Sequence, residues 1–200
     1  MTIVNGYATL AEFKAYAKID STDTNDDAVI EDIIEGISRQ IDLYCGRVFF
    51  ITTATARYYR ADEGDLLLVD DVASTTSFAI ATDNDGDGTF ENTWTAADYN
   101  LLPYQSTNGE PFTMIETSAQ GAFAFSTLRK GNKITALWGY AAVPDNVKQA
   151  CLISCEAEYH SRFGENMSGV ATITGAGVVI TPKGLPQSAL QKLESYRRLV

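Results

Sequence analysis

The residues from 83 to 91 carry the sharpest chemical pattern in the sequence. The run reads DNDGDGTFE, so carboxylates alternate with small or polar residues ahead of a glycine. This spacing can turn several hard oxygens toward one Ca²⁺ ion, as in an EF-hand loop. The match covers half of such a loop, because Trp94 occupies the position of the bidentate glutamate. Two interpretations stay open: a polar hairpin turn, or a weak calcium site formed by Asp83, Asp85, Asp87 and Glu91.

Motifs for catalysis are absent from the sequence. The single imidazole, His160, has no GxSxG elbow near which it would activate a serine. Glycine loops of the phosphate-binding types GxxxxGKS/T and GxGxxG are also missing. Three cysteines without CxxC spacing are expected to be reduced core residues: Cys45, Cys151 and Cys155. We therefore predict a protein that is not an enzyme and that needs no cofactor apart from the calcium considered above.

The charge balance argues against nucleic-acid binding. The 200 residues include 15 Lys and Arg against 26 Asp and Glu, a formal charge of −11. Basic side chains are needed to hold phosphates, and residues 61–104 contain none. The aromatic residues of that region are therefore expected to pack in strands rather than to stack on bases. The sequence also contains no apolar run that predicts a signal peptide or a membrane span.

Local signals predict the first two helices. Residues 9–12 read TLAE, a capping box ahead of a short helix that runs to about Lys18. A long helix follows, with an N-cap at Thr24 or Asn25 and a stop at Gly46. Its inward stripe is predicted to consist of Ile30, Ile33, Ile34, Ile37, Ile41 and Tyr44. Its solvent face is predicted to carry Glu31, Asp32, Glu35 and Arg39.

Two further helices are predicted in the last third of the chain. The first begins at Pro144 and Asp145 and ends at Phe163. A face of small residues should let another helix approach it closely: Val147, Ala150, Cys151 and Ser154. The last helix begins at Pro186 and ends among cations.

Between Arg47 and Tyr140 the hydrophobic period changes from that of a helix to that of a strand. Candidate strands cover residues 55–59, 65–69, 77–82, 89–94, 99–102, 112–116, 122–125 and 133–138. The predicted fold class is α+β, a helical core of about four helices with a large inserted antiparallel β-rich module. The helical core is assigned to residues 1–46 and 141–200, and the module to 47–140.

Two segments near the C-terminus are expected to bind partners. The Gly/Thr-rich stretch 164–184 is nearly uncharged and β-prone, so it must either pack on its own domain or pair, as an arm, with a neighbouring subunit. The expected contacts of that arm are Val170, Ile173, Val178 and Ile180. An island of positive charge follows, for which docking and ordinary helix capping are both open: Lys183, Lys192, Arg197 and Arg198.

Four segments carry a resemblance to a known family. They are YATLAEFKAY at 7–16, IDLYCGR at 41–47, GYAAVPDNVKQA at 139–150, and the closing helix from Leu185-Pro186 to Tyr196-Arg197-Arg198. In this order they resemble the head–tail connector (adaptor) proteins of long-tailed bacteriophages and prophages. The resemblance covers about half of the chain, and the large insertion departs from the smallest members.

The resemblance implies a structural virion protein at the head–tail junction, made in the cytoplasm of the bacterial host. It implies a homo-oligomeric ring, commonly twelvefold, between the portal protein and a tail or stopper protein. Packaged DNA would pass through that ring as cargo, and no membrane or catalytic residue is involved. Two rivals remain: a calcium-stabilised β-rich binding or adhesion module, and a small hydrolase that uses a pair of carboxylates.

Overall fold

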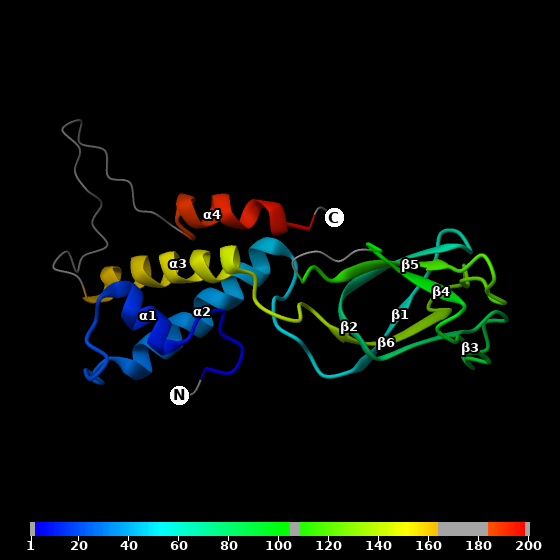
Figure 1. The fold of residues 1–200 in the computed structure, drawn as a ribbon, viewed down its shortest axis with the longest axis horizontal. Coiled ribbons are helices and arrows are strands. Elements are labelled where there is room, and N and C mark those ends of the chain that lie inside the picture. The colour runs from blue at the N-terminus through cyan, green and yellow to red at the C-terminus, as the bar shows by residue number, and fades with distance from the viewer. Residues whose placement is uncertain (1–2, 105–108, 164–183, 199–200) are drawn as a thin grey trace. The chain divides into compact units, whose positions relative to one another are not determined.

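The computed structural model describes residues 3–104, 109–163 and 184–198. The chain divides into two compact units, one from Met1–Arg47 with Val143–Val200 and the other from Val48–Ala142. The first unit is helical, and the second is built on an antiparallel sheet (Figure 1). The predicted α+β fold class is confirmed. Within the described residues, no helix combines the length and the apolar character needed to span a membrane.

Helix α1 (Leu10–Ala17) begins at the predicted capping box. The Thr9 hydroxyl accepts the backbone N–H of Glu12 at 3.2 Å, and Glu12 Oε2 accepts the backbone N–H of Thr9 at 2.8 Å. Two amides that lack partners inside the helix are thereby satisfied. Lys18 ends the helix in the left-handed conformation, at φ +57°.

Helix α2 (Asp27–Cys45) buries the five isoleucines of the predicted stripe on its inner side. The prediction is wrong for Tyr44, which is partly exposed because its hydroxyl donates to Glu194 at the surface. The N-cap is Asp26 rather than the predicted Thr24 or Asn25, and no side chain caps the first turn. The Asp26 carboxylate instead accepts the hydroxyl of Tyr159 at 3.0 Å. A partner 133 residues away leaves no local signal in the sequence. Gly46 ends the helix at φ +66°, as predicted.

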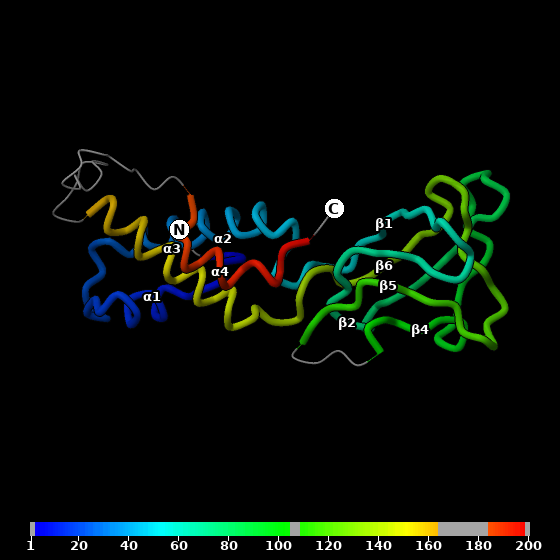
Figure 2. Tube along the Cα trace, turned by 90° about the horizontal axis from the view of Figure 1, so that it is seen from above, coloured from blue at the N-terminus to red at the C-terminus, as the bar shows by residue number. Residues whose placement is uncertain are grey.

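Helix α3 (Asp145–Phe163) is the centre of the helical unit and contacts α1, α2 and α4 (Gln187–Leu193). Helix α4 runs along α3 on the side away from α1 and α2 (Figure 1), and a short 3-10 helix, η1 (Glu194–Tyr196), follows it. Seen from above, α1 and α2 lie on either side of α3 (Figure 2). The small residues predicted for close helix packing are buried: Val147, Ala150, Cys151 and Ser154.

Six strands form one antiparallel sheet in the second unit, in the order β1-β6-β2-β5-β4, with β3 paired to β2. They are β1 (Thr55–Tyr59), β2 (Leu66–Thr82), β3 (Asn92–Thr93), β4 (Tyr99–Leu102), β5 (Phe112–Thr117) and β6 (Asn132–Trp138). The long strand β2 pairs with β5 near its beginning and with β6 from Val72 onward. Inward side chains form one buried cluster that includes Leu67, Val72, Ile80, Ile115, Ile134 and Trp138.

Two predicted strands are parts of one. The segments 65–69 and 77–82 both belong to β2. The polar residues between them stay in the strand as an irregular stretch, where the pairing with β6 shifts at Ser74 and Ser77 adopts φ +57°. A bulge therefore separates the two apolar runs where the sequence predicts a break.

Two other strand predictions are wrong. The strand expected at 89–94 is reduced to Asn92–Thr93, and residues 122–125 form no strand. Phe123 and Phe125 instead pack on the ring of Trp94, with centroids 5.8 and 4.6 Å apart. Their alternation in the sequence thus reflects a loop that covers one aromatic side chain.

The chain begins and ends the second unit at neighbouring points. The backbone N–H of Thr52 donates to the Trp138 carbonyl at 2.9 Å, and the rings of Phe49 and Tyr140 lie 4.9 Å apart. Gly139, between Trp138 and Tyr140 in the sequence, adopts φ +100°, and a Cβ there would come within 2.1 Å of the Phe50 carbonyl oxygen. Only glycine fits this approach, so the two ends of the unit are held side by side.

Replacing Ile41 by alanine should lower the free energy of unfolding of the helical unit by about 3 kcal/mol, because the lost methyl groups leave a cavity. Ile41 is fully buried, whereas Leu43, two residues later, is 84% exposed. The matched control Leu43→Ala should change that free energy by less than about 0.5 kcal/mol. Urea unfolding followed by circular dichroism measures both. Equal losses would contradict the burial pattern of α2.

Candidate functional site

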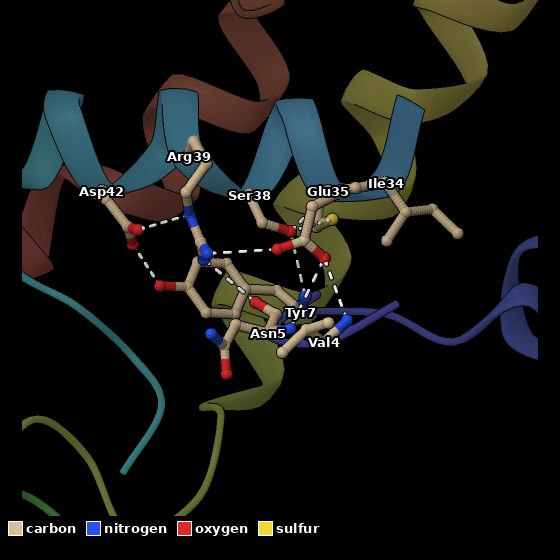
Figure 3. A network of polar contacts seen from close by, with 9 residues as sticks. Val4, Asn5, Tyr7, Ile34, Glu35, Ser38, Arg39 and Asp42 are labelled. Atoms are coloured by element: carbon tan, nitrogen blue, oxygen red, sulfur yellow. Dashed lines mark hydrogen bonds and ion pairs between the residues drawn. The ribbon is translucent and has the colours of Figure 1, made fainter. Parts of the chain in front are cut away.

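Residues 4–7, here called the N-terminal strap, are bound to α2 by side chains (Figure 3). Glu35 Oε2 accepts two consecutive backbone N–H groups of the strap, at 3.3 and 3.4 Å. Ser38 Oγ accepts the backbone N–H of Tyr7 at 3.0 Å. The strap forms neither helix nor strand, so these side chains satisfy donors that would otherwise need water.

Arg39 and Asp42 complete this network. Asp42 accepts the hydroxyl of Tyr7 and forms an ion pair with Arg39, whose Nε lies 2.9 Å from Oδ2. Arg39 also donates to the Asn5 carbonyl at 2.9 Å. Burial raises the pKa of the Asp42 carboxyl, and Tyr7 and Arg39 oppose that rise. The prediction that Glu35 and Arg39 face solvent is wrong, because both are partly buried and bind a segment about 30 residues away.

The predicted docking cations are placed on the C-terminal segment, residues 184–198. Lys192 is partly buried and donates to Gln149 of α3 at 2.8 Å. Arg197 is exposed, with its guanidinium 5.8 Å from the centre of the Tyr44 ring. Both cations therefore reach the surface of the helical unit while contacting neutral groups on α2 and α3.

The same segment also caps α2. The backbone N–H of Arg198 donates to the Cys45 carbonyl at 2.8 Å, and the Tyr44 hydroxyl donates to Glu194 at 2.8 Å. A carbonyl at the end of α2 that lacks a partner inside the helix is thereby satisfied. Docking by the cations stays a prediction. The other predicted contacts lie outside the described residues: Val170, Ile173, Val178, Ile180 and Lys183.

The structure brings the four predicted calcium ligands together in one loop, here called the acidic loop (residues 83–91). One carboxylate oxygen from each lies within 4.8 Å of the others: Asp83, Asp85, Asp87 and Glu91. Among these, Asp83 is buried and the other three are exposed. The spacing in the sequence therefore predicts the convergence of these side chains correctly.

Asp83 organises the acidic loop through backbone hydrogen bonds. Its carboxylate accepts the N–H groups of Gly86 at 2.6 Å, Gly88 at 2.9 Å and Asp85 at 3.2 Å. These bonds, led by that of Gly86, lower the pKa of the Asp83 carboxyl. Gly86 and Gly88 adopt φ +83° and +90°, which the turn requires. The amides already satisfy the buried carboxylate, as a hairpin turn requires. The convergence of four carboxylates is also what a calcium site requires, so the geometry is compatible with both interpretations of the loop.

Other groups that carry chemistry are dispersed or buried. His160 is exposed, and its Nε2 lies 4.0 Å from a carboxylate oxygen of Glu156. The sulfurs of Cys151 and Cys155 lie 3.8 Å apart in the core, as predicted for structural cysteines. Burial raises the pKa of the Cys45 thiol to about 11, which keeps it protonated at neutral pH. In the part of the chain that the structure describes, only the acidic loop gathers three or more potential metal ligands.

Comparisons with known proteins find no matching protein family and no similar curated sequence. Solved structures do share the fold. The neck of an empty GTA (gene transfer agent) particle, computed with C6 symmetry, contains a chain that aligns with a TM-score of 0.59 and 17% identity, over 100% of this chain and 94% of that chain. The neck of a native GTA particle, computed with C12 symmetry, gives 0.55 and 17%, over 100% and 93%. This chain resembles those neck chains over its whole length.

The Asp83→Asn variant should melt at a lower temperature than wild type at neutral pH, because the buried anionic acceptor of three amides is lost. Since folding lowers the pKa of Asp83, its carboxylate stabilises the folded state above the ordinary carboxyl range. That stabilisation is lost as the pH falls through the lowered pKa, so the difference between the two melting temperatures should shrink in acid. Asp87→Asn, whose carboxylate is exposed and accepts one backbone N–H, is the matched control. A difference that is independent of pH would contradict this role.

Calcium binding by the acidic loop stays a prediction, and calorimetric titration separates the two interpretations. A calcium site predicts that Ca²⁺ releases or absorbs heat with wild type and that Asp85→Ala abolishes this heat, because one of four converging carboxylates is removed. A hairpin turn predicts equal, negligible heats for both proteins.

Proposed function

We propose that this protein is a structural subunit of the neck of a bacteriophage or phage-like particle, at the junction of head and tail. The observation that carries the proposal is the similarity of fold, over the whole chain, to chains of GTA necks. The sequence resemblance to head–tail connector proteins, which rests on the helical segments alone, supports the same role. The role is structural and assigns no catalytic residue.

In this role, copies of the protein form a closed ring. The GTA necks were computed with C6 and C12 symmetry, which supports a cyclic ring, and twelve copies would match the C12 case. A cyclic ring requires heterologous contacts, in which two unlike surfaces of each subunit meet. The helical unit offers unlike surfaces, since α4 covers one side of α3 and α1 with α2 cover another. The ring lies between the portal protein and a tail or stopper protein.

The acidic composition suits the passage of DNA through the ring. Proteins that hold DNA neutralise its phosphates with Lys and Arg, and this subunit has a formal charge of −11. An acidic lining repels phosphates, so the DNA slides through as cargo without being bound. A solved ring with a basic channel wall would contradict this part of the proposal.

The C-terminal segment is the proposed contact with the portal protein. Ala189 and Leu193 of α4 are fully buried, so they anchor the segment and leave Lys192 and Arg197 at the surface. An acidic portal surface would be complementary to these cations. The predicted arm, from Val170 to Ile180, is the second proposed contact and would pair with a neighbouring subunit.

The double reversal Lys192→Glu with Arg197→Glu should weaken attachment to portal-bearing heads by about tenfold or more, because attraction becomes repulsion. Deleting the whole segment is a poorer test, since it would expose the core beneath α4. Attachment is measured by co-sedimentation with heads, and electron microscopy of the bound protein shows whether a ring forms.

The matched control is Arg162→Glu, which reverses an exposed cation on α3 that already pairs with Glu158. It should leave attachment unchanged, and all variants should keep the wild-type melting temperature. Undiminished attachment of the double variant would refute docking by these cations. Bound protein that forms no ring would refute the proposed function itself.

A further inference from the structure

Strand β4 is an open edge of the sheet (Figure 1). In the described part of the chain, β5 is the only strand that pairs with it. The backbone N–H of Ser118 donates to the Asp98 carbonyl at 2.8 Å, which fixes the phase of the hydrogen bonds between the two strands. Backbone groups of an antiparallel strand point to its two sides in alternation, so those of Tyr99 and Leu101 point away from β5. They are available to a further strand.

The opposite edge of the sheet, β1, suits a further strand less well. Its Thr55 carbonyl already accepts the indole N–H of Trp138 at 2.9 Å. Its Arg57 forms an ion pair with Asp70, with 2.6 Å between the nitrogen and the oxygen. Charged side chains on an edge strand discourage pairing with another chain. Strand β4 has the sequence YNLL and carries no charged residue, so it is the edge that a further strand would extend.

The outer face of the sheet beside β4 is apolar. Leu68 of β2 is directly opposite Met114 of β5, and Met114 is directly opposite Leu102 of β4. Directly opposite residues of an antiparallel sheet lie on the same face. Leu68 is 65% exposed while its neighbour Leu67 is fully buried, so this row lies on the outer face. The row ends at Leu102, where an added strand would continue it with one more apolar side chain.

The composition of the predicted arm favours it as the occupant over the β4 edge of a second copy. Residues 166–182 contain no charged residue, and two runs within them are rich in β-branched residues: VATIT at 170–174 and VVIT at 178–181. Residues 61–104 of the β unit, by contrast, include ten acidic residues and no basic one, so two such edges would repel each other. The 20 residues between Phe163 and Gly184 are long enough to extend about 33 Å and return.

We infer that the arm of one copy adds as a strand to the free edge of β4 of a neighbouring copy. This inference rests on the proposed ring, because it requires neighbours side by side. One of the two β-branched runs hydrogen-bonds to the backbone groups of Tyr99 and Leu101. Alternate side chains of that run extend the apolar row beyond Leu102. The contact is heterologous, since the arm belongs to the helical unit and the edge to the β unit, so every copy gives one surface and receives the other.

The test is a cysteine scan of the arm against β4. One protein carries Asn100→Cys, and a second, enlarged by a fusion tag, carries a single new cysteine at one of the positions 170–174 or 178–181. Asn100 is exposed, and toward the arm it takes a non-hydrogen-bonded position, where opposite side chains lie close enough for a disulfide. The two proteins are mixed, assembled with portal protein and mildly oxidised, and the mixed dimer is identified by its size on a non-reducing gel. Wild type should give no covalent dimer, because its cysteines are buried.

The mixed dimer should form at every second position of one run, because side chains of a strand alternate between its two faces. Its yield should differ about fivefold or more between neighbouring positions. The matched control replaces Asn100→Cys by Ala56→Cys, which is exposed on β1 at the opposite edge, and it should give no mixed dimer. Equal yields at consecutive positions would overturn the addition of a strand. Equal yields with the control would overturn the assignment to β4.

Electron microscopy of the same samples before oxidation separates the possible failures. Rings without a mixed dimer at any position would overturn this contact and leave the proposed function intact. A disulfide within one chain that carries both cysteines, without mixed dimers, would place the arm on its own β unit and would also overturn the contact. The absence of both rings and mixed dimers would refute the contact and the proposed function together.

Discussion

The close packing of α3 against α2 is the contact on which the helical unit depends. The Ser38 hydroxyl of α2 lies 3.7 Å from the sulfur of Cys151, and Ala150 and Cys155 are fully buried. Larger side chains would push the helices apart, because protein interiors are close-packed. The same hydroxyl accepts the backbone N–H of Tyr7, so the position of the N-terminal strap follows from this contact. With its inner side held in this way, α2 leaves Asp32, Gly36 and Leu43 exposed on its opposite side.

The helices could be predicted from the sequence because their signals act over a few residues. The Thr9 capping box and the Gly46 stop use neighbouring backbone groups, and the isoleucine stripe repeats every turn. Interactions between distant segments could not be predicted. The carboxylate of Asp26 accepts the hydroxyl of Tyr159 instead of capping its own helix, and Glu35 binds the strap. The sequence does not distinguish a polar helix residue that faces water from one that binds a remote segment.

The candidate sites show the same difference between local signals, which the sequence reveals, and contacts that depend on the fold. The acidic loop is local, so alternate spacing of carboxylates was enough to predict that they converge. The structure adds the buried Asp83 and the amides that hold it. Surfaces that bind partners depend on what the fold leaves uncovered. In the sequence Leu43 resembles any apolar residue of a helix, and only the structure shows that it is 84% exposed.

The side-by-side ends of the β unit have a consequence for how such proteins diverge. The pairing of Thr52 with Trp138 closes the loop between the flanking residues from within the unit itself. An insertion that closes its own loop places little entropic or geometric demand on the helices that flank it. Such a unit can be lengthened, shortened or replaced in evolution while the helical scaffold stays the same.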